Sequence, residues 1–309
     1  MPHKRYCWAG PDVRPGVRRC VLKHAVVALC HHVAVTAPHL ERSIQWRGRT
    51  VAWDSFGWGP TLVLLHGTPW SSALWGPIAR ALAERFTVYL WDMPGYGASS
   101  KHAEHPVDLG TQGELFAALL TEWGLEDPHV IAHDFGGAVA LRARLLHGAR
   151  YRSLCLVDVV ALSPWGSPFF TLVREHAEVF AQLPPAVHRG AVEAYIRGAS
   201  HRGLREEDLA MLVEPWTGAD GQAAFYRQIA QADERYTDEV EPSYGTITEP
   251  THIVWGVQDS WIPADRAERL HRLIPGSSTT LIEGAGHLVQ LDAPAQLAAE
   301  LSRWTESVR

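Results

Sequence analysis

VIAHDFGG, residues 130–137, decides the fold of this chain. Val130 and Ile131 are typical strand residues, and Gly136 and Gly137 permit a sharp bend directly after them. A helical pattern, FGGAVALRARLLHG, begins at residue 135 without an intervening loop. The segment therefore predicts a strand, a tight turn and a helix, with the carboxylate of Asp134 at the apex of the turn.

Strands and helices alternate on both sides of this segment. The expected strands are 43–48 and 50–57, which form an opening hairpin, and the apolar runs 61–66, 86–92, 128–133, 153–160, 251–256 and 278–284. The expected helices are 71–86, with Ser71 or Ser72 as N-cap, 114–124, 135–148 and 264–274. This alternation predicts an α/β fold with a mostly parallel central sheet and helices on both faces.

The strand pattern is interrupted once. Residues 163–245 contain helical segments and no strand pattern, which predicts an inserted helical cap. The α/β core is then expected in two pieces, 41–162 and 246–309. Residues 1–40 are rich in Arg, His, Pro and Gly without a steady period, so we expect a disordered N-terminal extension.

Composition excludes several classes of protein. The chain has 309 residues, 46% hydrophobic and 20% charged, an ordinary globular balance, and its formal net charge of −6 argues against nucleic acid as a partner. No apolar run reaches the roughly 18 residues of a membrane span. We therefore expect a soluble, cytoplasmic protein that needs no membrane.

Cysteine usage indicates neither a disulfide framework nor a zinc site. Three of the four cysteines, Cys7, Cys20 and Cys30, lie in the N-terminal extension, and no CxxC pair occurs. Cys155 lies inside an apolar strand, where a free cysteine behaves as a small hydrophobic residue. No metal or organic cofactor is expected.

Three polar residues follow three expected strands. Asp134 follows 128–133, Asp259 follows 251–256, and His287 follows 278–284. Each alone has an ordinary explanation, such as a helix N-cap for an Asp. Because carboxyl ends of parallel strands share one edge of the sheet, we expect the three side chains to meet there, in the order nucleophile, acid, histidine.

From about residue 43 onward the sequence resembles the α/β-hydrolases that carry a cap domain. The resemblance rests on HGTP (66–69), DMPGYGAS (92–99), AHDFGG (132–137), WGVQDSWIP (255–263) and GAGH (284–287). Within that superfamily, HDxGG is similar to the branch with an Asp nucleophile, which holds epoxide hydrolases and haloalkane dehalogenases. The resemblance implies a catalytic triad of Asp134, His287 and Asp259.

The resemblance also implies a two-step reaction. The Asp134 carboxylate attacks an sp³ carbon and forms an alkyl ester with the protein, and water activated by His287 then hydrolyses that ester. Backbone N–H groups of Thr68 and Phe135 are expected to form the oxyanion hole. The expected partners are a small apolar organic substrate and water.

The leaving group separates two substrate classes. A departing halide needs a hydrogen-bond donor, and Phe135 and Thr68 stand where dehalogenases of this type carry Trp and Asn. An epoxide oxygen needs an acid, and the resemblance of AFYRQ to a cap segment of epoxide hydrolases points to Tyr226 as that donor. Tyr195 or His176 is expected to be the second donor. Epoxide hydrolysis is therefore the favoured interpretation, and haloalkane dehalogenation the alternative.

Other interpretations stay open. Trp70, Trp165 and Trp216 are expected either in the core or along an apolar substrate cavity. A lyase or cyclase could use Asp134 as a general base on the same fold, and a ligand-binding protein could keep the cavity without turnover. The presence of both His287 and Asp259 favours an enzyme, since a binding protein does not need a pair that activates water.

Overall fold

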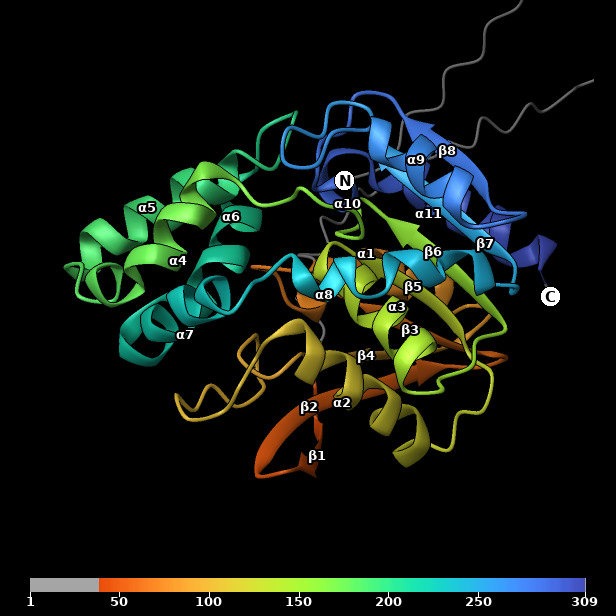
Figure 1. Cartoon of the computed structure of the whole chain (residues 1–309), viewed down its shortest axis with the longest axis horizontal. Coiled ribbons are helices and arrows are strands. Elements are labelled where there is room, and N and C mark those ends of the chain that lie inside the picture. Colours follow the sequence, from red (N-terminus) through yellow and green to blue (C-terminus); the bar gives the residue numbers. More distant parts are fainter. Residues whose placement is uncertain (1–38, 309) are drawn as a thin grey trace, which may run out of the picture. The chain divides into compact units, whose positions relative to one another are not determined.

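An eight-stranded sheet forms the centre of the described chain (Figure 1). The computed structural model describes residues 39–308. The strands are β1 Arg42–Trp46, β2 Arg49–Gly57, β3 Thr61–Leu65, β4 Thr87–Trp91, β5 His129–His133, β6 Ser153–Val157, β7 Thr251–Gly256 and β8 Ser278–Ile282. They lie in the order β1-β2-β4-β3-β5-β6-β7-β8. β1 pairs antiparallel with β2, β2 pairs antiparallel with β4, and the remaining pairs are parallel, which confirms the predicted mostly parallel sheet and the opening hairpin.

Helices cover both faces of this sheet. Leu62 and Leu64 of β3 pack in one cluster with α1 (Gly76–Leu82) and α11 (Pro294–Ser307). Val63 and Leu65 belong to a second cluster, on the opposite face, with α2 (Leu109–Glu122), α3 (Phe135–Leu146) and α9 (Asp265–Leu273). Since both faces are covered, the central strands are buried along nearly their whole length and appear in the sequence as continuous apolar runs.

The helix expected over residues 71–86 is divided. A 3₁₀ turn, η1, spans Ser72–Trp75, and Ser71 caps it by accepting a hydrogen bond from the Ala73 N–H. α1 starts afresh at Gly76, because Pro77 has no N–H with which to continue a hydrogen-bond ladder from the preceding turn. α11 was not predicted. It packs through Leu297, Leu301 and Trp304 against the same face as α1.

Between β6 and β7 the chain forms helices and no strand. These elements are α4 Pro168–Phe180, α5 Pro185–Arg197, α6 Glu206–Val213, η2 Glu214–Trp216, α7 Gly218–Ala230, α8 Arg235–Asp238 and η3 Glu241–Thr246. α4 to α7 gather beside one edge of the α/β layers, whereas α8 lies over α3 (Figure 1). We refer to residues 163–245 as the helical insertion; its role as a cap remains a prediction.

The order of the strands creates a switch point beside β3. The chain passes from β3 to β4 on one side and then crosses to β5 on the other. Loops that leave the carboxyl ends of β3 and β5 therefore diverge and leave a crevice between them, where ligands bind in open α/β sheets. Thr68 follows β3 and Asp134 follows β5, so the switch point lies at the predicted site.

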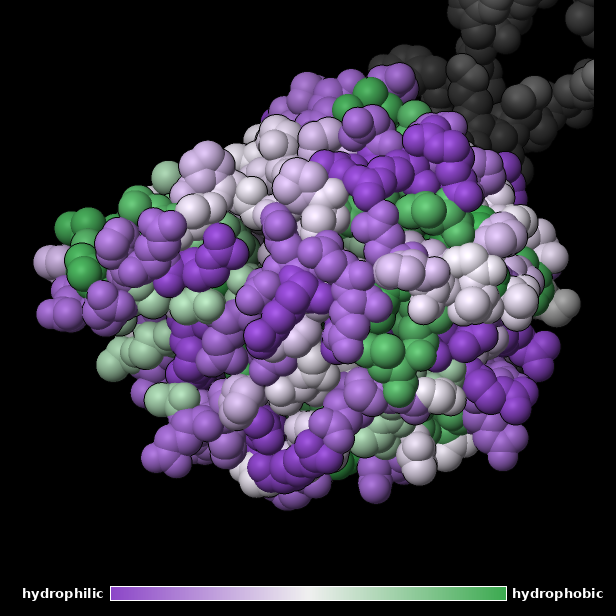
Figure 2. Space-filling model, viewed as in Figure 1, coloured by the Kyte–Doolittle hydropathy of each residue, from purple (hydrophilic) through white to green (hydrophobic). Residues whose placement is uncertain are grey.

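Some predictions concern residues outside the described part of the chain. The expected extension 1–40 lies there apart from its last two residues, as do Cys7, Cys20 and Cys30. Cys155 is fully buried in β6, as predicted. Within residues 39–308, no helix has both the length and the apolar character needed to span a membrane. Figure 2 shows a largely hydrophilic face whose apolar groups include the α4–α5 end of the helical insertion, where Leu172, Val179 and Val187 are exposed.

Candidate active site

Asp134 occupies a strained turn between β5 and α3. Its backbone has φ 52° and ψ −122°, a conformation that non-glycine residues rarely adopt. A Cβ at Gly136 would lie 2.6 Å from the His66 carbonyl oxygen, and one at Gly137 would lie 2.4 Å from Val159. Both glycines are thus required for α3 to pack closely against the strands, and the turn points the Asp134 side chain out of the sheet edge.

The loop after β3 contacts the Asp134 carboxylate directly. The Thr68 N–H donates to Oδ1 of Asp134 at 2.5 Å. A Cβ at Gly67 would lie only 2.2 Å from the same oxygen, so no side chain fits at that position. Phe135 is the first residue of α3, and its N–H is one of the helix-start amides that have no acceptor within the helix. Of the two predicted oxyanion donors, the Thr68 N–H therefore contacts the carboxylate, and the role of the Phe135 N–H remains a prediction.

Gly67→Ala provides a test of this contact. The new methyl group would displace the Asp134 carboxylate from the Thr68 N–H, and a displacement of about 1 Å at a reacting group costs on the order of a hundredfold in rate. We expect at least that loss in the rate of substrate hydrolysis. Gly190→Ala, in α5, is the control, because an added Cβ there meets no atom within 4 Å. Equal rates for both variants would contradict the assigned contact.

His287 lies between two carboxylates. Its Nε2 is 3.3 Å from Oδ2 of Asp134, and its Nδ1 is 2.8 Å from Oδ2 of Asp259. Oδ1 of Asp259 accepts the backbone N–H groups of Trp261 and Ile262 at 2.8 and 2.9 Å, which hold the acid in place. The structure therefore brings together the three residues predicted from the strand ends.

These carboxylates determine the charge of His287. Burial alone would lower the pKa of His287, but the charges and hydrogen bonds of Asp259 and Asp134 raise it well above its ordinary value. The imidazole is therefore protonated near neutral pH while Asp134 carries its charge. The neighbouring His133 behaves oppositely: burial, then the positive charge of His287, lowers the pKa of His133 to about 3, so this residue stays neutral.

A buried carboxylate fixes the loop that carries His287. Asp292 accepts hydrogen bonds from the N–H groups of Gly286 (2.8 Å) and His201 (2.8 Å) and from the Ser200 hydroxyl (2.5 Å). Ser200 and His201 belong to the helical insertion, whereas Gly286 directly precedes His287. This cluster therefore ties the insertion to the His287 loop.

A narrow cavity of about 30 Å³ opens beside Asp134. Its lining is apolar or aromatic apart from a few polar groups, and comes from both the α/β core and the insertion: Thr68, Asp134, Phe135, Val160, Trp165, Gly166, Ser167, Phe170, Tyr195, Trp261 and Ile262. No lysine or arginine is among these lining residues. The cavity therefore suits a small neutral molecule rather than an anion.

Stacked aromatic rings form one wall of the site. The Trp261 ring stacks on Tyr195 with centroids 4.4 Å apart and on Trp70 at 5.7 Å. The same ring stacks on the His287 imidazole at 5.1 Å. Since the backbone N–H of Trp261 also donates to Asp259, this residue links the acid, the histidine and the cavity wall.

Tyr195 belongs to the cavity lining and carries a hydroxyl group. Its OH has no hydrogen-bond partner among residues 39–308, and its ring belongs to the cavity lining. Burial raises the pKa of Tyr195 well above its usual range, and the negative charge of Asp134 raises it further. The phenol therefore keeps its proton at neutral pH and can donate a hydrogen bond.

The structure corrects the placement of Tyr226. Its hydroxyl hydrogen-bonds to Nδ1 of His188 at 2.9 Å, and its ring is buried against Phe180 and Phe225, outside the cavity lining. Burial raises the pKa of Tyr226 to about 12. Because the packing between α5 and α7 commits this phenol to His188, Tyr226 does not face Asp134.

Other predicted cavity residues are placed differently. Trp165 lines the cavity, but its indole N–H donates to the Thr237 hydroxyl at 2.9 Å. Trp70 is buried behind Trp261 and is not in the lining, and Trp216 is a core residue whose N–H donates to the Pro69 carbonyl. His176 is exposed on α4, at a break in the helix, and the prediction that it lies in the pocket is wrong.

Several functional positions were missed from the sequence. Trp261 stands two residues after the predicted acid, and that proximity was the available signal. Asp158 follows β6 as Asp134 follows β5 and Asp259 follows β7, so its place at a strand end could have indicated a buried group of the site. Phe170 carries no local signal, because only the packing of the insertion brings it to the cavity.

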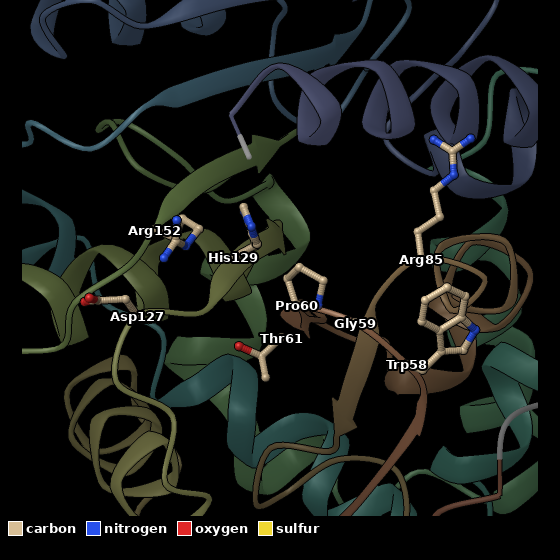
Figure 3. A pocket seen from close by; sticks show the side chains of 8 residues that line it. All are labelled: Trp58, Gly59, Pro60, Thr61, Arg85, Asp127, His129 and Arg152. Carbon is tan, nitrogen blue, oxygen red and sulfur yellow. The ribbon is translucent and has the colours of Figure 1, made fainter.

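A larger cavity, of about 620 Å³, lies at the opposite edge of the sheet (Figure 3). Thr61 and His129, the first residues of β3 and β5, contribute to its lining, together with Arg85, Arg152 and Trp58. None of the predicted catalytic residues is near the amino ends of these strands. Among residues 39–308, no group of three or more His, Cys, Asp or Glu side chains is arranged to hold a metal ion.

Sequence comparison establishes the family. The family model described as the alpha/beta hydrolase fold matches residues 60–294, which is most of the chain. The chain therefore belongs to the α/β-hydrolase fold family, in agreement with its sheet and with the order of Asp134, Asp259 and His287. It is a hydrolase of that family.

Relatives carry several different activities in their names. An alpha/beta hydrolase fold protein from Burkholderia ambifaria, known as a crystal structure, is 43% identical, with a TM-score of 0.84 over 86% of this chain and 98% of that one. Pimeloyl-[acyl-carrier protein] methyl ester esterase of Aeromonas hydrophila is 29% identical over 80% of this chain and 96% of its own length. Haloalkane dehalogenase 2 of Mycobacterium bovis is 24% identical, over 82% and 91%.

Proposed function

We propose that this hydrolase opens small epoxides through a covalent ester on Asp134. The observation that carries the proposal is a carboxylate, instead of a hydroxyl, at the turn after β5, beside a cavity whose lining includes Tyr195. A carboxylate attacking an ester would form an anhydride, an activated product, whereas its attack on an alkyl carbon forms a stable ester. The Asp therefore favours alkyl electrophiles over the carboxyl esters named for one relative.

The first step is ring opening. Oδ1 of Asp134 is held by the Thr68 N–H, so Oδ2 is the oxygen expected to bond to the epoxide carbon. The carbon–oxygen bond of the epoxide breaks, and the departing oxygen takes the proton of the Tyr195 hydroxyl. His287, which starts as an imidazolium, returns a proton to the Tyr195 phenolate through water.

Alkylation changes His287 from an acid to a base. Once Asp134 is an ester it has no charge, so one of the two carboxylates that raise the pKa of His287 is lost and the pKa falls. Neutral His287 then takes a proton from water, and the hydroxide attacks Cγ of the ester. The Thr68 and Phe135 N–H groups stabilise the oxyanion on Oδ1.

Product release restores the starting charges. The tetrahedral intermediate collapses, the diol oxygen leaves with the proton held by His287, and Asp134 regains a carboxyl group. The proton of that carboxyl passes to His287, which becomes an imidazolium again between Asp134 and Asp259. One water is consumed for each epoxide opened, and the cycle needs no cofactor.

Haloalkane dehalogenation is the second candidate, supported by the similarity to the dehalogenase of Mycobacterium bovis. A halide leaves without a proton but needs donors around it. Phe135 supplies no side-chain donor, and the Trp165 indole N–H is already bound to Thr237. Tyr195 is the side-chain hydroxyl that we assign to the leaving group, and a phenol that gives up its proton suits an epoxide oxygen better than a halide.

The proposal extends to the surroundings of the enzyme. The helical insertion acts as a cap that shields the ester from bulk water, since it supplies Trp165, Phe170 and Tyr195 to the cavity. The substrate is a small, apolar, neutral molecule, and the reaction takes place in the cytoplasm without nucleic acid or membrane.

Tyr195→Phe tests the leaving-group donor. Loss of a donor that acts mainly in the transition state typically costs about 3 kcal/mol, or about a hundredfold in rate. We expect that loss in the rate of epoxide opening, and a smaller one on a bromoalkane of similar shape. Single-turnover measurement of diol and ester formation provides the rate.

Tyr226→Phe is the matched control. It should open the epoxide at close to the parental rate, because its hydroxyl serves His188, and it should lower the free energy of unfolding by about 1 kcal/mol. A large loss in Tyr226→Phe together with a normal rate in Tyr195→Phe would reverse the assignment.

A further inference from the structure

A second buried carboxyl group lies behind the candidate triad. Asp158 follows β6 with φ 45°, and its side chain is completely buried. Oδ1 accepts the Gly256 N–H at 2.8 Å, but Oδ2 has no donor among the described residues. A buried oxygen without a donor is costly unless it carries a proton of its own.

Strand pairing brings this group to Asp259. β6 and β7 are parallel neighbours, and the Asp158 N–H donates to the Val254 carbonyl at 3.0 Å. Gly256, which binds Oδ1 of Asp158, also accepts the Asp259 N–H on its carbonyl at 3.1 Å. The two carboxyl groups therefore flank the same glycine at the ends of neighbouring strands.

Charge decides the protonation of the pair. Burial raises the pKa of Asp158 well above the usual range, and the negative charge of Asp259 raises it further, against an opposing effect of His287. Asp259 already receives N–H donors from Trp261, Ile262 and His287, so it has the donor set of an ionised carboxylate. Asp158 has only one donor and must supply the other hydrogen itself.

We propose that Asp158 is a neutral carboxylic acid whose proton is donated to Asp259, and that it is a positioning residue for the Asp259–His287 pair. A donor on Asp259 disperses part of the carboxylate charge and weakens its hold on the His287 proton. An ionised Asp158 would add a second negative charge behind the pair and raise the pKa of His287 further. The charged or titratable groups that face this unit are Asp259 and His287 and, beyond His287, Asp134 and His133. That this weaker hold matters for hydrolysis of the Asp134 ester rests on the proposed function. The proton shared between Asp158 and Asp259 does not depend on that function.

Two substitutions separate a neutral from an ionised Asp158 without any substrate. The amide of Asp158→Asn can still donate to Asp259, so the pKa of His287, followed by ¹⁵N NMR of the ring, should stay near the parental value. Asp158→Ala removes the donor, so the pKa of His287 should rise. If Asp158 were ionised, both substitutions would remove a negative charge and the pKa of His287 would fall in both, which would overturn the proposal.

Infrared difference spectroscopy provides an independent readout and covers the case in which Asp158→Ala does not fold. Parent minus Asp158→Asn should show the carbonyl band of one protonated carboxyl group per chain at neutral pH, shifted by ¹³C-aspartate labelling. Parent minus Asp220→Asn, an exposed carboxylate, should show no such band. Absence of the band in the first difference would also refute the shared proton. Failure of epoxide turnover would leave both readouts intact and would count only against the proposed function.

Discussion

Asp134→Asn is expected to abolish turnover. An amide has neither the charge nor the available lone pair of a carboxylate, so no ester can form. Removal of a covalent nucleophile in a hydrolase costs on the order of 10⁶ in kcat, and we expect a loss of at least about 10⁴ because no other carboxylate reaches the cavity lining. The rate of epoxide hydrolysis measures the loss, with intact-protein mass confirming that the amide has not reverted to Asp.

The same variant carries a control for folding. Asp134 is one of the two carboxylates that raise the pKa of His287, so in Asp134→Asn that pKa should fall while the Nδ1 contact to Asp259 persists. A folded variant with a lowered pKa of His287 and full activity would exclude the covalent mechanism. A folded variant with neither turnover nor bound adduct is the expected result.

The fold and the grouping of Asp134, Asp259 and His287 could be predicted because their signals are local. Each central strand is a short apolar run, and each of Asp134, Asp259 and His287 follows its strand within a few residues. Because parallel strands end at one edge of the sheet, the adjacency of these strands brings the three side chains together. The glycines around Asp134 carry the same information, because their contacts with His66 and Val159 leave no room for a Cβ.

The cavity could not be predicted because its walls depend on packing between distant helices. Tyr195 and Tyr226 both stand on amphipathic helices of the insertion, and the pattern of either helix is compatible with a buried or a cavity-facing phenol. His188 of α5 forms a hydrogen bond with the Tyr226 hydroxyl, which keeps that phenol in the core. Trp261, from another loop, stacks on the Tyr195 ring. Both contacts join residues far apart in sequence, so no local signal encodes them.

The layer behind the triad was missed for a similar reason. Asp158 ends an apolar strand and is followed by Val159 and Val160, so its segment reads as one buried run. Its position beside Asp259 requires β6 and β7 to be neighbours, although about 90 residues, most of them in the helical insertion, separate the two strands in sequence. The insertion thus separates in sequence two carboxyl groups, Asp158 and Asp259, that the sheet places at neighbouring strand ends.

His287→Gln is expected to separate the two half-reactions. Ring opening requires Asp134 and a proton donor, both of which remain, so the ester should still form, with Tyr195 regaining its proton from water. Hydrolysis of that ester requires a base beside Cγ of Asp134, and glutamine has no basic nitrogen. The variant should therefore consume one epoxide per site, retain it as the hydroxyalkyl ester and then stop, with a loss of steady-state rate of at least about 10⁴.

Intact-protein and peptide mass spectrometry provide the measurement for His287→Gln, and the added mass should equal that of the epoxide and map to the peptide containing Asp134. His176→Gln is the matched control, since His176 is exposed on α4 and has no place in the cavity; it should turn over normally and show no adduct. A His287→Gln protein that hydrolyses an accepted epoxide at the parental rate would remove His287 as the base. If His287→Gln accumulates no ester while the parent and His176→Gln are active, His287 is needed already for ring opening. The raised pKa of His287 makes this possible, because an imidazolium can itself protonate the departing oxygen.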